Sequence, residues 1–423
     1  MSRHTCNSGN LSRGLVLMFC LACCLTARAE TLFINDATVY TMSSAGVLQD
    51  GDILVRDGRI VSVATGLTAP EDATVIEAQG RPVTPGFFAG ITGLGLDEIT
   101  AVESSVDNSL SVDSMRPEFD VTTAFNPHSS AIPVTRIEGY TWTMLGADRS
   151  GSIIAGQGQG ASLDGSYQPF MGKRVLFIDV GADASGQSGD SRAAQWMLLE
   201  QAMTEASEEV SWSPAPLLTV TGRKALADFK SGGIVVFNAD RASDILQVIG
   251  FSKRHGLNSV ISGATEAWMV ANQLAEAGVP VLIDALSNLP GSFDEIGARL
   301  DNAALLNQAG VTLAFYGTGT QEARKLRQVA GNAVANGLPY EAGLAAMTIS
   351  PAIIFALGDD YGSIEENSVA DLVIWSGDPL EVTAAADQVI IAGKPVEMVS
   401  RQTLLRDRYL PENPGMPRAY IKP

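Results

Sequence analysis

The chain has 423 residues, of which 46% are hydrophobic and 18% charged, a composition typical of a large folded protein rather than a disordered one. Its formal net charge of −19 argues against nucleic acid and anionic lipid as partners, because like charges repel. All four cysteines lie in the first 24 residues, so the rest of the chain must fold without disulfide bonds.

Residues 1–29 are predicted to form a secretory signal peptide. An apolar run of twelve residues, Gly14–Leu25, follows two arginines and precedes an Ala-Arg-Ala cleavage site. The run is too short to span a bilayer, which takes about 20 apolar residues. A lipid anchor on Cys23 or Cys24 is the alternative, although the residues before them match poorly. We therefore expect an exported, periplasmic chain with no membrane span. Its net charge becomes −22, because the leader carries three arginines and no acidic residue.

The first mature stretch predicts antiparallel strands. Short apolar runs alternate with polar residues, and Asp57-Gly58 is a tight hairpin turn between two of them. Residues 370–393 show the same pattern near the other end of the chain. Two such segments around a long middle predict a small composite β-sandwich that is formed from residues 30–84 and 366–423.

The middle of the chain alternates apolar strands with helices. Strands are predicted over 174–178, 233–238, 259–262, 279–283 and 311–315, and helices over 191–207, 243–255 and 265–277. This alternation indicates parallel βα units and an α/β fold. Five or six units are clear and eight would close a barrel, so we predict a (β/α)₈ TIM-type barrel over residues 85–365, with an open sheet as the alternative.

Residues 97–166 have a different composition, rich in Ser, Asn, Pro and Gly, and predict a loop-rich insertion. The glycine-rich run 153–160 would cradle phosphate only if it opened a helix after a strand. The residues after it read as strand and turn instead, so we expect a loop packed beside the barrel mouth.

Short motifs spread along the chain match one family in order. They are Asp57-Gly58-Arg59-Ile60, Val83-Thr84-Pro85-Gly86-Phe87, Ala345-Ala346-Met347-Thr348 and the run from Ala370 to Glu381. With these motifs the chain resembles the imidazolonepropionase-like branch of the amidohydrolase superfamily, over nearly all of its mature length. The resemblance implies a barrel with a composite β-sandwich. It also implies a metal-activated water, held by one or two zinc ions, that hydrolyses C–N bonds in cyclic amides or dipeptide-like substrates.

The positions at which that family binds metal hold other residues here. By the resemblance, the replaced positions are Ile91, Gly93, Asn238, Trp268 and Gly319. Zinc needs about three nitrogen, sulfur or carboxylate ligands, which this set does not supply. We also expect Trp268 to fill volume where metal and substrate would sit. The sequence therefore predicts no metal and no other cofactor.

Carboxylates are the remaining candidates for catalysis. Asp240 and Glu266 fall at or near strand ends on the expected active face, as do Asp97, Glu98 and Asp284. A pair of them would do acid–base chemistry if their pKa values were driven apart. The alternative is structural, because Asp97 and Asp240 each sit where a helix could begin.

Two histidines remain after the leader. His128 lies in a loop that could approach the barrel mouth, so it is a third catalytic candidate, with a surface loop as the alternative. His255 ends a predicted helix, where the helix dipole favours it.

Together these features predict an exported amidohydrolase-family protein that is metal-free and catalytically silent. It would act by binding a small molecule, or as a partner subunit for itself or for an intact amidohydrolase paralogue. The alternative is an active hydrolase of C–N bonds that uses carboxylates or an atypical metal site.

Overall fold

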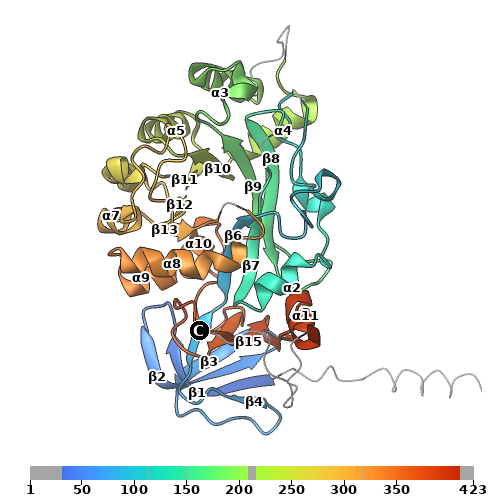
Figure 1. Cartoon of the computed structure of the whole chain (residues 1–423), viewed down its shortest axis with the longest axis vertical. Helices are drawn as coiled ribbons and strands as arrows, with labels where there is room; N and C mark the ends of the chain where they lie inside the picture. Colours follow the sequence, from blue (N-terminus) through green and yellow to red (C-terminus); the bar gives the residue numbers. More distant parts are fainter. Residues whose placement is uncertain (1–30, 113, 149, 208–215, 318, 410–423) are drawn as a thin grey trace, which may run out of the picture.

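Two eight-stranded sheets organise the chain, one in a β-rich domain and one in a barrel (Figure 1). The computed structural model describes residues 31–409 except 113, 149, 208–215 and 318. The predicted signal peptide, residues 1–29, lies outside the described residues. In the part of the chain that is described, no helix is long and apolar enough to cross a membrane.

The β-rich domain combines strands from both ends of the described chain. Its strands are β1 (Thr31–Tyr40), β2 (Val47–Arg56), β3 (Arg59–Thr65), β4 (Thr74–Glu77), β5 (Pro82–Pro85), β14 (Leu372–Trp375), β15 (Ala386–Ile391) and β16 (Lys394–Pro395). The order is β16-β15-β14-β5-β1-β2-β3, and β4 pairs with the first half of β1. Asp57 and Gly58 both have positive φ in the turn between β2 and β3, which is the hairpin geometry that an Asp-Gly pair favours.

The barrel sheet follows the order of the chain. Its strands are β6 (Phe87–Thr92), β7 (Tyr140–Leu145), β8 (Ile154–Ser162), β9 (Phe170–Asp179), β10 (Ile234–Ala239), β11 (Asn258–Gly263), β12 (Val281–Ile283) and β13 (Leu313–Phe315). The sheet nearly closes, because a Cβ on Gly90 of β6 would lie 3.6 Å from the Cα of Tyr316, next to β13. The predicted TIM-type barrel with a β-rich domain is confirmed.

One barrel strand runs in the opposite direction to the others. β8 is antiparallel to both β7 and β9, while the other neighbouring strands in this sheet are parallel. β8 contains the glycine-rich run 153–160 almost entirely, so the prediction of a loop at the barrel mouth is wrong for this run. The glycines have a structural reason: a Cβ on Gly158 would lie 1.7 Å from the carbonyl oxygen of Leu145 on β7. Residues 97–166 thus supply two barrel strands as well as loops.

Helices surround the parallel part of the barrel (Figure 1). They are α2 (Ala131–Arg136), α3 (Arg192–Glu205), α4 (Val220–Lys230), α5 (Ala242–His255), α6 (Ala271–Ala277), α7 (Asn302–Gln308), α8 (Leu326–Ala335), α9 (Tyr340–Ala345), α10 (Ile349–Ile354) and α11 (Arg401–Tyr409). Short 3-10 turns are η1 (Glu103–Ser105), η2 (Val121–Ala124), η3 (Ser185–Ser188), η4 (Ala267–Val270) and η5 (Ala323–Lys325). The helices predicted over 191–207 and 243–255 are α3 and α5, and the one predicted over 265–277 is divided between η4 and α6.

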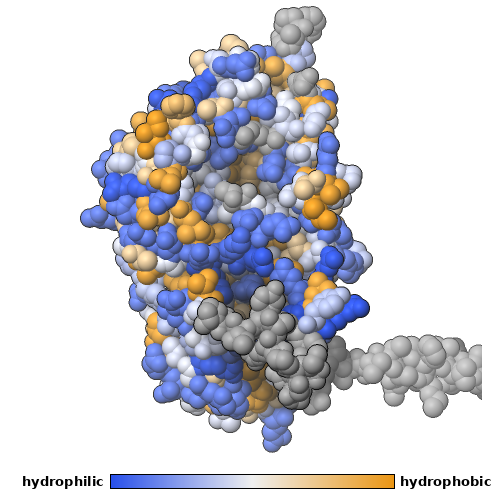
Figure 2. Space-filling model, in the orientation of Figure 1, coloured by the Kyte–Doolittle hydropathy of each residue, from blue (hydrophilic) through white to orange (hydrophobic). Residues whose placement is uncertain are grey.

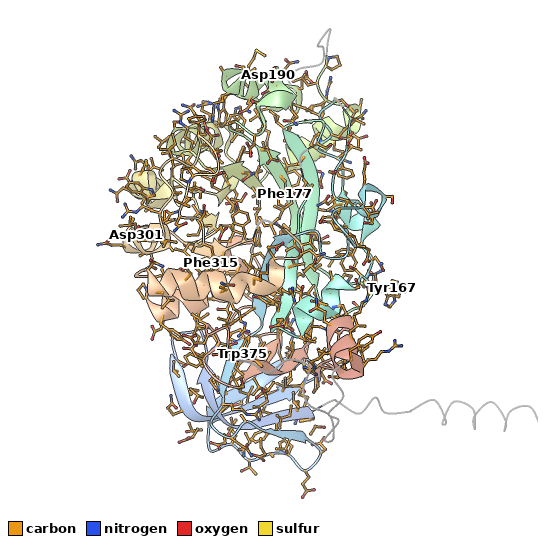
Figure 3. The ribbon with its side chains drawn as sticks, in the orientation of Figure 1. Tyr167, Phe177, Asp190, Asp301, Phe315 and Trp375 are labelled. Atoms are coloured by element: carbon orange, nitrogen blue, oxygen red, sulfur yellow. The ribbon has the colours of Figure 1, made fainter. Side chains whose placement is uncertain are left out.

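Trp375 of β14 connects the β-rich domain to the barrel (Figure 3). Its indole Nε1 donates a hydrogen bond of 2.9 Å to the Thr84 hydroxyl, and its ring centroid lies 4.9 Å from that of Phe87 on β6. The guanidinium of Arg327 on α8 lies 4.8 Å from the same ring. Gly139 has room only for hydrogen here, because a Cβ would lie 2.3 Å from the indole. The fully buried indole therefore holds both sheets in one core.

Candidate functional site

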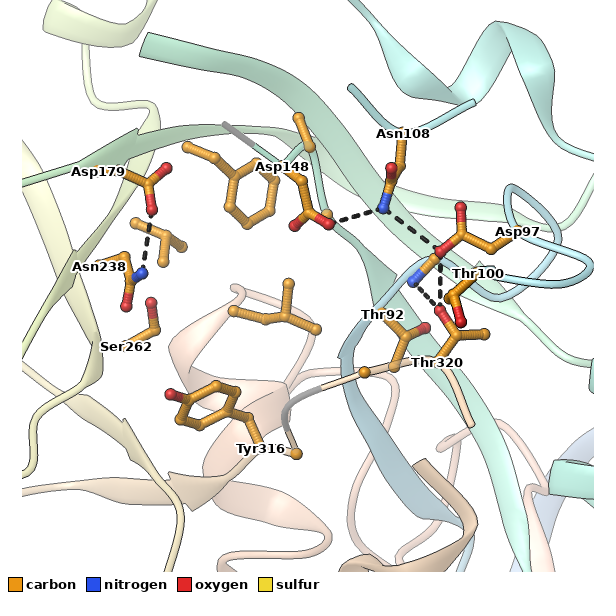
Figure 4. A pocket seen from close by; sticks show the side chains of 18 of the residues that line it. Thr92, Asp97, Thr100, Asn108, Asp148, Asp179, Asn238, Ser262, Tyr316 and Thr320 are labelled. Carbon is orange, nitrogen blue, oxygen red and sulfur yellow. Dashed lines mark hydrogen bonds between the residues drawn. The ribbon is translucent and has the colours of Figure 1, made fainter. Parts of the chain in front are cut away.

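A cavity of about 370 Å³ opens at the end of the barrel where the carboxyl ends of the parallel strands meet (Figure 4). Active sites of TIM barrels lie at this end. The side chains that line it include Ile91, Thr92, Asp97, Asn108, Asp148, Phe177, Asp179, Val236, Asn238, Ser262, Tyr316 and Thr320. On the face drawn in Figure 2, coloured hydrophobic and hydrophilic side chains are interspersed around the hollowed middle of the molecule.

Two carboxylates share one amide on one side of the cavity (Figure 4). The Nδ2 atom of Asn108 donates to Asp148 Oδ2 at 2.9 Å and, more weakly, to Asp97 Oδ2 at 3.4 Å. The Thr320 hydroxyl also donates to Asp97 Oδ2, at 3.1 Å, and accepts from the N–H of Gly93 at 3.0 Å. Loops after β6, β7 and β13 are thus joined through neutral hydrogen-bond donors.

Asp97 is a buried carboxylate in the cavity wall. It is only 5% exposed, and its Oδ1 atom has no hydrogen-bond partner among the described residues. Burial raises the pKa of Asp97 to about 6, and the charges of Asp148 and Asp107 act in the same direction. The Thr320 hydroxyl lowers this pKa but does not offset burial. At pH 7 the carboxylate is therefore mostly ionised in a place that disfavours its charge.

The carboxylate of Asp97 occupies the space that a side chain at position 93 would need. A Cβ on Gly93 would lie 2.1 Å from Asp97 Oδ2 and 2.9 Å from the Thr320 hydroxyl. Real Cβ atoms do not approach other atoms so closely, so glycine at position 93 and aspartate at position 97 fit each other. A histidine at position 93 would displace Asp97.

The opposite side of the cavity is formed by the ends of β9, β10, β11 and β13. Asn238 donates from Nδ2 to Asp179 Oδ1 at 3.0 Å, with Ser262 and Tyr316 beside them (Figure 4). Burial raises the pKa of the Tyr316 phenol, and nearby carboxylates, Asp240 first among them, raise it further. The phenol therefore keeps its proton and presents a donor to the cavity.

Four of the five residues that were aligned with the family's metal positions by resemblance line this cavity. Ile91, Gly93, Asn238 and Gly319 are among its lining residues, whereas Trp268 is not. Trp268 lies on η4, donates from Nε1 to the carbonyl of Gly297 at 2.9 Å, and stacks against Arg299 at 4.5 Å. The expectation that Trp268 fills the cavity is wrong, because η4 carries it away from the strand end. Ser262 of β11 lines the cavity there instead.

The residues present do not fit a catalytic zinc site. Ile91, Gly93 and Gly319 offer no ligand atom, and Asn238 directs its amide nitrogen to Asp179. Within the described ranges, no group of three or more His, Cys, Asp or Glu side chains is arranged to hold a metal ion. Three such ligands around an open position are what zinc needs to activate water.

Asp240 and Glu266 stabilise loops outside the cavity lining. Asp240 Oδ1 accepts from the Thr265 hydroxyl at 2.6 Å, and burial raises the pKa of its carboxyl group. Glu266 accepts from the N–H of Ala242 at 3.0 Å and from the N–H of Gly297 at 2.9 Å. Glu266 therefore satisfies a free N–H at the start of α5, a position that favours negative charge. Asp240 precedes that helix but binds Thr265.

Neither histidine of the described residues lines the cavity. His128 lies in an exposed loop with its Nε2 atom 2.8 Å from the Tyr167 hydroxyl. His255 ends α5, as predicted, with its Nε2 atom 2.8 Å from Glu200 Oε2. Of the other predicted carboxylates, Glu98 and Asp284 also lie outside this lining, and Asp97 alone belongs to it.

The sequence prediction missed three of the polar residues in the cavity. Asp179 has a recognisable signal, because it is an acidic residue at the end of a buried apolar strand. Asn108 and Asp148 lie in loops, where neither spacing nor periodicity identifies them.

Comparison with known proteins agrees with this architecture. A profile of the amidohydrolase family matches residues 226–396. The chain is 25% identical over 401 residues to the imidazolonepropionase of Sphingopyxis alaskensis, covering 84% of this chain and 94% of that protein. It is 27% identical over 390 residues to the imidazolonepropionase of Chromobacterium violaceum, covering 82% and 91%. The crystal structure of an amidohydrolase from Thermotoga maritima superposes with a TM-score of 0.76 at 24% identity, covering 86% of this chain and 99% of that one.

Fold and cavity together define an amidohydrolase-type barrel. These matches support assignment to the amidohydrolase superfamily, and the relatives of similar length point to its imidazolonepropionase-like branch. The family profile begins inside α4, so the segment around Gly93 and Asp97 lies ahead of the matched residues.

Proposed function

We propose that this chain is a small-molecule binding protein built on an amidohydrolase scaffold that no longer carries out metal-dependent hydrolysis. The observation that carries the proposal concerns Gly93 and Asp97. By the resemblance, the family has a metal-binding side chain at position 93, and here the carboxylate of Asp97 fills the space of that side chain. This exchange removes one ligand position and blocks its simple restoration.

The cavity itself is retained. It is lined by apolar side chains together with a few converging polar groups, which is the usual construction of a ligand pocket. Its volume of about 370 Å³ suits a small organic ligand. A buried carboxylate such as Asp97 lowers the stability of the fold when no opposite charge lies beside it. Its presence therefore supports a function for the cavity.

Elemental analysis tests this proposal. Untagged protein is exposed to zinc or manganese, passed through a desalting column and analysed, with zinc-loaded carbonic anhydrase as the recovery control. We expect less than about a tenth of an equivalent of metal, because a site without three ligands does not retain it. One or more retained equivalents, removed by a chelator together with hydrolysis of a cyclic amide, would overturn the proposal. Hydrolysis that survives the chelator and is lost in Asp97→Asn would instead support the carboxylate-dependent hydrolase.

A second candidate function, a partner subunit for an intact amidohydrolase paralogue, is favoured by an apolar loop near the barrel mouth. In the loop after β12, the side chains of Leu289, Phe293 and Ile296 are 75%, 87% and 65% exposed. Exposed apolar clusters mark contact surfaces. In the middle of this loop, next to Phe293, Asp294 pairs with Arg192 of α3. Two acidic copies of the same chain repel each other, which favours a different chain as the occupant.

Co-expression with a paralogue that keeps its histidines tests this role. A complex of defined stoichiometry, measured by light scattering, should form with the wild-type chain and dissociate in Phe293→Ser. The matched control is Val220→Ser, which changes an equally exposed apolar side chain on α4. Equal complex formation by both variants would exclude the loop as the contact.

Export is part of the proposal and rests on the sequence of residues 1–29. Cell fractionation should place the protein in the periplasm, with Glu30 as its first residue by N-terminal sequencing. A cytoplasmic chain that retains its leader would contradict it.

A further inference from the structure

We infer that the cavity binds an organic cation, with an ammonium or guanidinium group beside Asp97 and Asp148 and an apolar body against Ile91 and Phe177. The inference rests on the proposed binding function and adds the chemical class of the ligand.

The charges that line the cavity point to this class. Three carboxylates line it, Asp97, Asp148 and Asp179, and no lysine or arginine of the described residues does. Among the described residues, the Asp97 carboxylate is hydrogen-bonded only by neutral groups, the Thr320 hydroxyl and the Asn108 amide, and its Oδ1 atom has no partner there. A buried carboxylate without a counter-charge is costly, so a ligand that brings positive charge is stabilised there. An anionic ligand would be repelled.

The position of Asn108 favours an organic cation over a metal ion. Its amide N–H groups are directed at Asp97 and Asp148, and thus lie between the carboxylates that would have to share a metal. A metal ion needs several ligand atoms around it, and no group of three or more His, Cys, Asp or Glu side chains is so arranged in the described part of the chain. An ammonium group needs only one or two of the acceptor lone pairs that these carboxylates still have.

The remaining wall suits the apolar part of such a ligand. Ile91, Phe177 and Val236 line the cavity, and the face of an aromatic ring attracts a nearby cation. The Tyr316 phenol and the Ser262 hydroxyl on the far side provide donors or acceptors for a second polar group of the ligand.

The test compares ligands of one shape that differ in charge. Phenethylamine, 2-phenylethanol and phenylacetate are titrated by calorimetry into the mature protein at pH 7.5, with agmatine as a guanidinium probe. We expect saturable binding of at least one cation, at least about tenfold weaker binding of the alcohol, and no binding of phenylacetate. Equal binding of amine and alcohol, or no binding of either cation, would overturn the inference.

Variants identify the carboxylates that matter. Asp97→Asn and Asp148→Asn should each weaken cation binding at least about tenfold, because a charged hydrogen bond becomes a neutral one. The matched control is Asp107→Asn, which removes an exposed negative charge near Asp97 that does not line the cavity. Circular dichroism confirms that each variant folds. If Asp97→Asn does not fold, the affinity of Asp148→Asn for the cation tests the site. Unchanged affinity in folded Asp148→Asn, or an equal loss in Asp107→Asn, would refute the site.

The outcomes separate this inference from the proposed function. If the metal-free protein binds the neutral alcohol as tightly as the amine, the binding function stands and the cationic class of the ligand is excluded. Retained metal together with hydrolysis would reject the binding role itself.

Discussion

Asp97 changes its charge close to neutral pH, and this gives the candidate site a pH dependence. Because burial raises its pKa to about 6, the carboxylate is mostly ionised at pH 7 and mostly protonated at pH 5. An aliphatic amine keeps its proton at both values. The attraction between them is therefore present above pH 6 and is lost below it.

We predict that cation affinity falls about tenfold between pH 7 and pH 5, since about a tenth of the Asp97 carboxyl group remains ionised one unit below its pKa. Calorimetric titration of phenethylamine at both pH values measures the change. In Asp97→Asn the affinity should be low and nearly independent of pH. A wild-type affinity that stays constant down to pH 5 would show that Asp97 does not contact the cation.

Asp371 provides a second pH dependence, of stability rather than binding. It is 6% exposed, and its carboxylate accepts a hydrogen bond from the N–H of Ala392. That bond and the nearby Thr141 hydroxyl lower its pKa without offsetting burial. Burial raises its pKa from 3.8 to about 6. Between these values the folded state binds more protons than the unfolded state, so stability falls as the pH rises through this window.

Asparagine at position 371 cannot ionise, so this variant does not lose stability as the pH rises through the window. We predict that the stability of Asp371→Asn relative to wild type increases by about 2 kcal/mol between pH 4.5 and pH 8, measured by urea unfolding. The exposed Asp359→Asn is the control for loss of a carboxylate. An equal difference between Asp371→Asn and wild type at both pH values would contradict the prediction.

At the residue scale the sequence predicts the strand-end positions of the cavity better than the polar side chains that line it from loops. Ile91, Gly93, Asn238 and Gly319 do line it, because the ends of barrel strands are fixed by the fold. Asn108 and Asp148 come from loops whose paths depend on tertiary packing.

At the scale of single elements, β8 is the clearest departure from the expected pattern. Its many glycines resemble a loop in sequence, yet Gly158 is required by close contact with the backbone of β7. Propensity favours a turn here, and packing between two neighbouring strands overrides it. The strongly apolar strands β9, β10 and β11 follow prediction because burial alone specifies them.

We predict that Gly158→Ala lowers stability by about 3 kcal/mol or more, because a methyl group would meet a backbone oxygen that cannot move aside. Thermal unfolding measures the loss. The control is Gly186→Ala in η3, where an added Cβ has no neighbour within 4 Å and the change should be within about 0.5 kcal/mol. Similar melting temperatures for both variants would mean that β8 is not closely packed.

At the scale of the whole molecule, Trp375 joins the β-rich domain and the barrel in one buried core. Its ring contacts Phe87, Gly139 and Arg327, all outside the domain that supplies it. The overall architecture could be predicted because both ends of the chain carry the same hairpin pattern. The residues that join the two parts could not be predicted, because the sequence around Trp375 does not show which distant residues pack against its ring.

We predict that Trp375→Ala lowers the free energy of unfolding by about 3–5 kcal/mol, from lost packing and the cavity left behind. Urea unfolding should also change from one transition to two as the domains lose contact. Phe293→Ala, which removes an exposed aromatic ring, is the control. A single transition with a loss below about 1 kcal/mol would show that other contacts join the domains.

The position of β5 in its sheet also bears on how the chain is made. β5 pairs with β1 on one side and with β14 on the other, so its second neighbour begins only at Leu372. During synthesis, β5 therefore has one hydrogen-bonding edge without a partner until β14 has been made. Such edges are sites of aggregation. A chain shortened before β14 would keep this edge permanently, which makes the last strands necessary for a soluble product even though they lie far from the cavity.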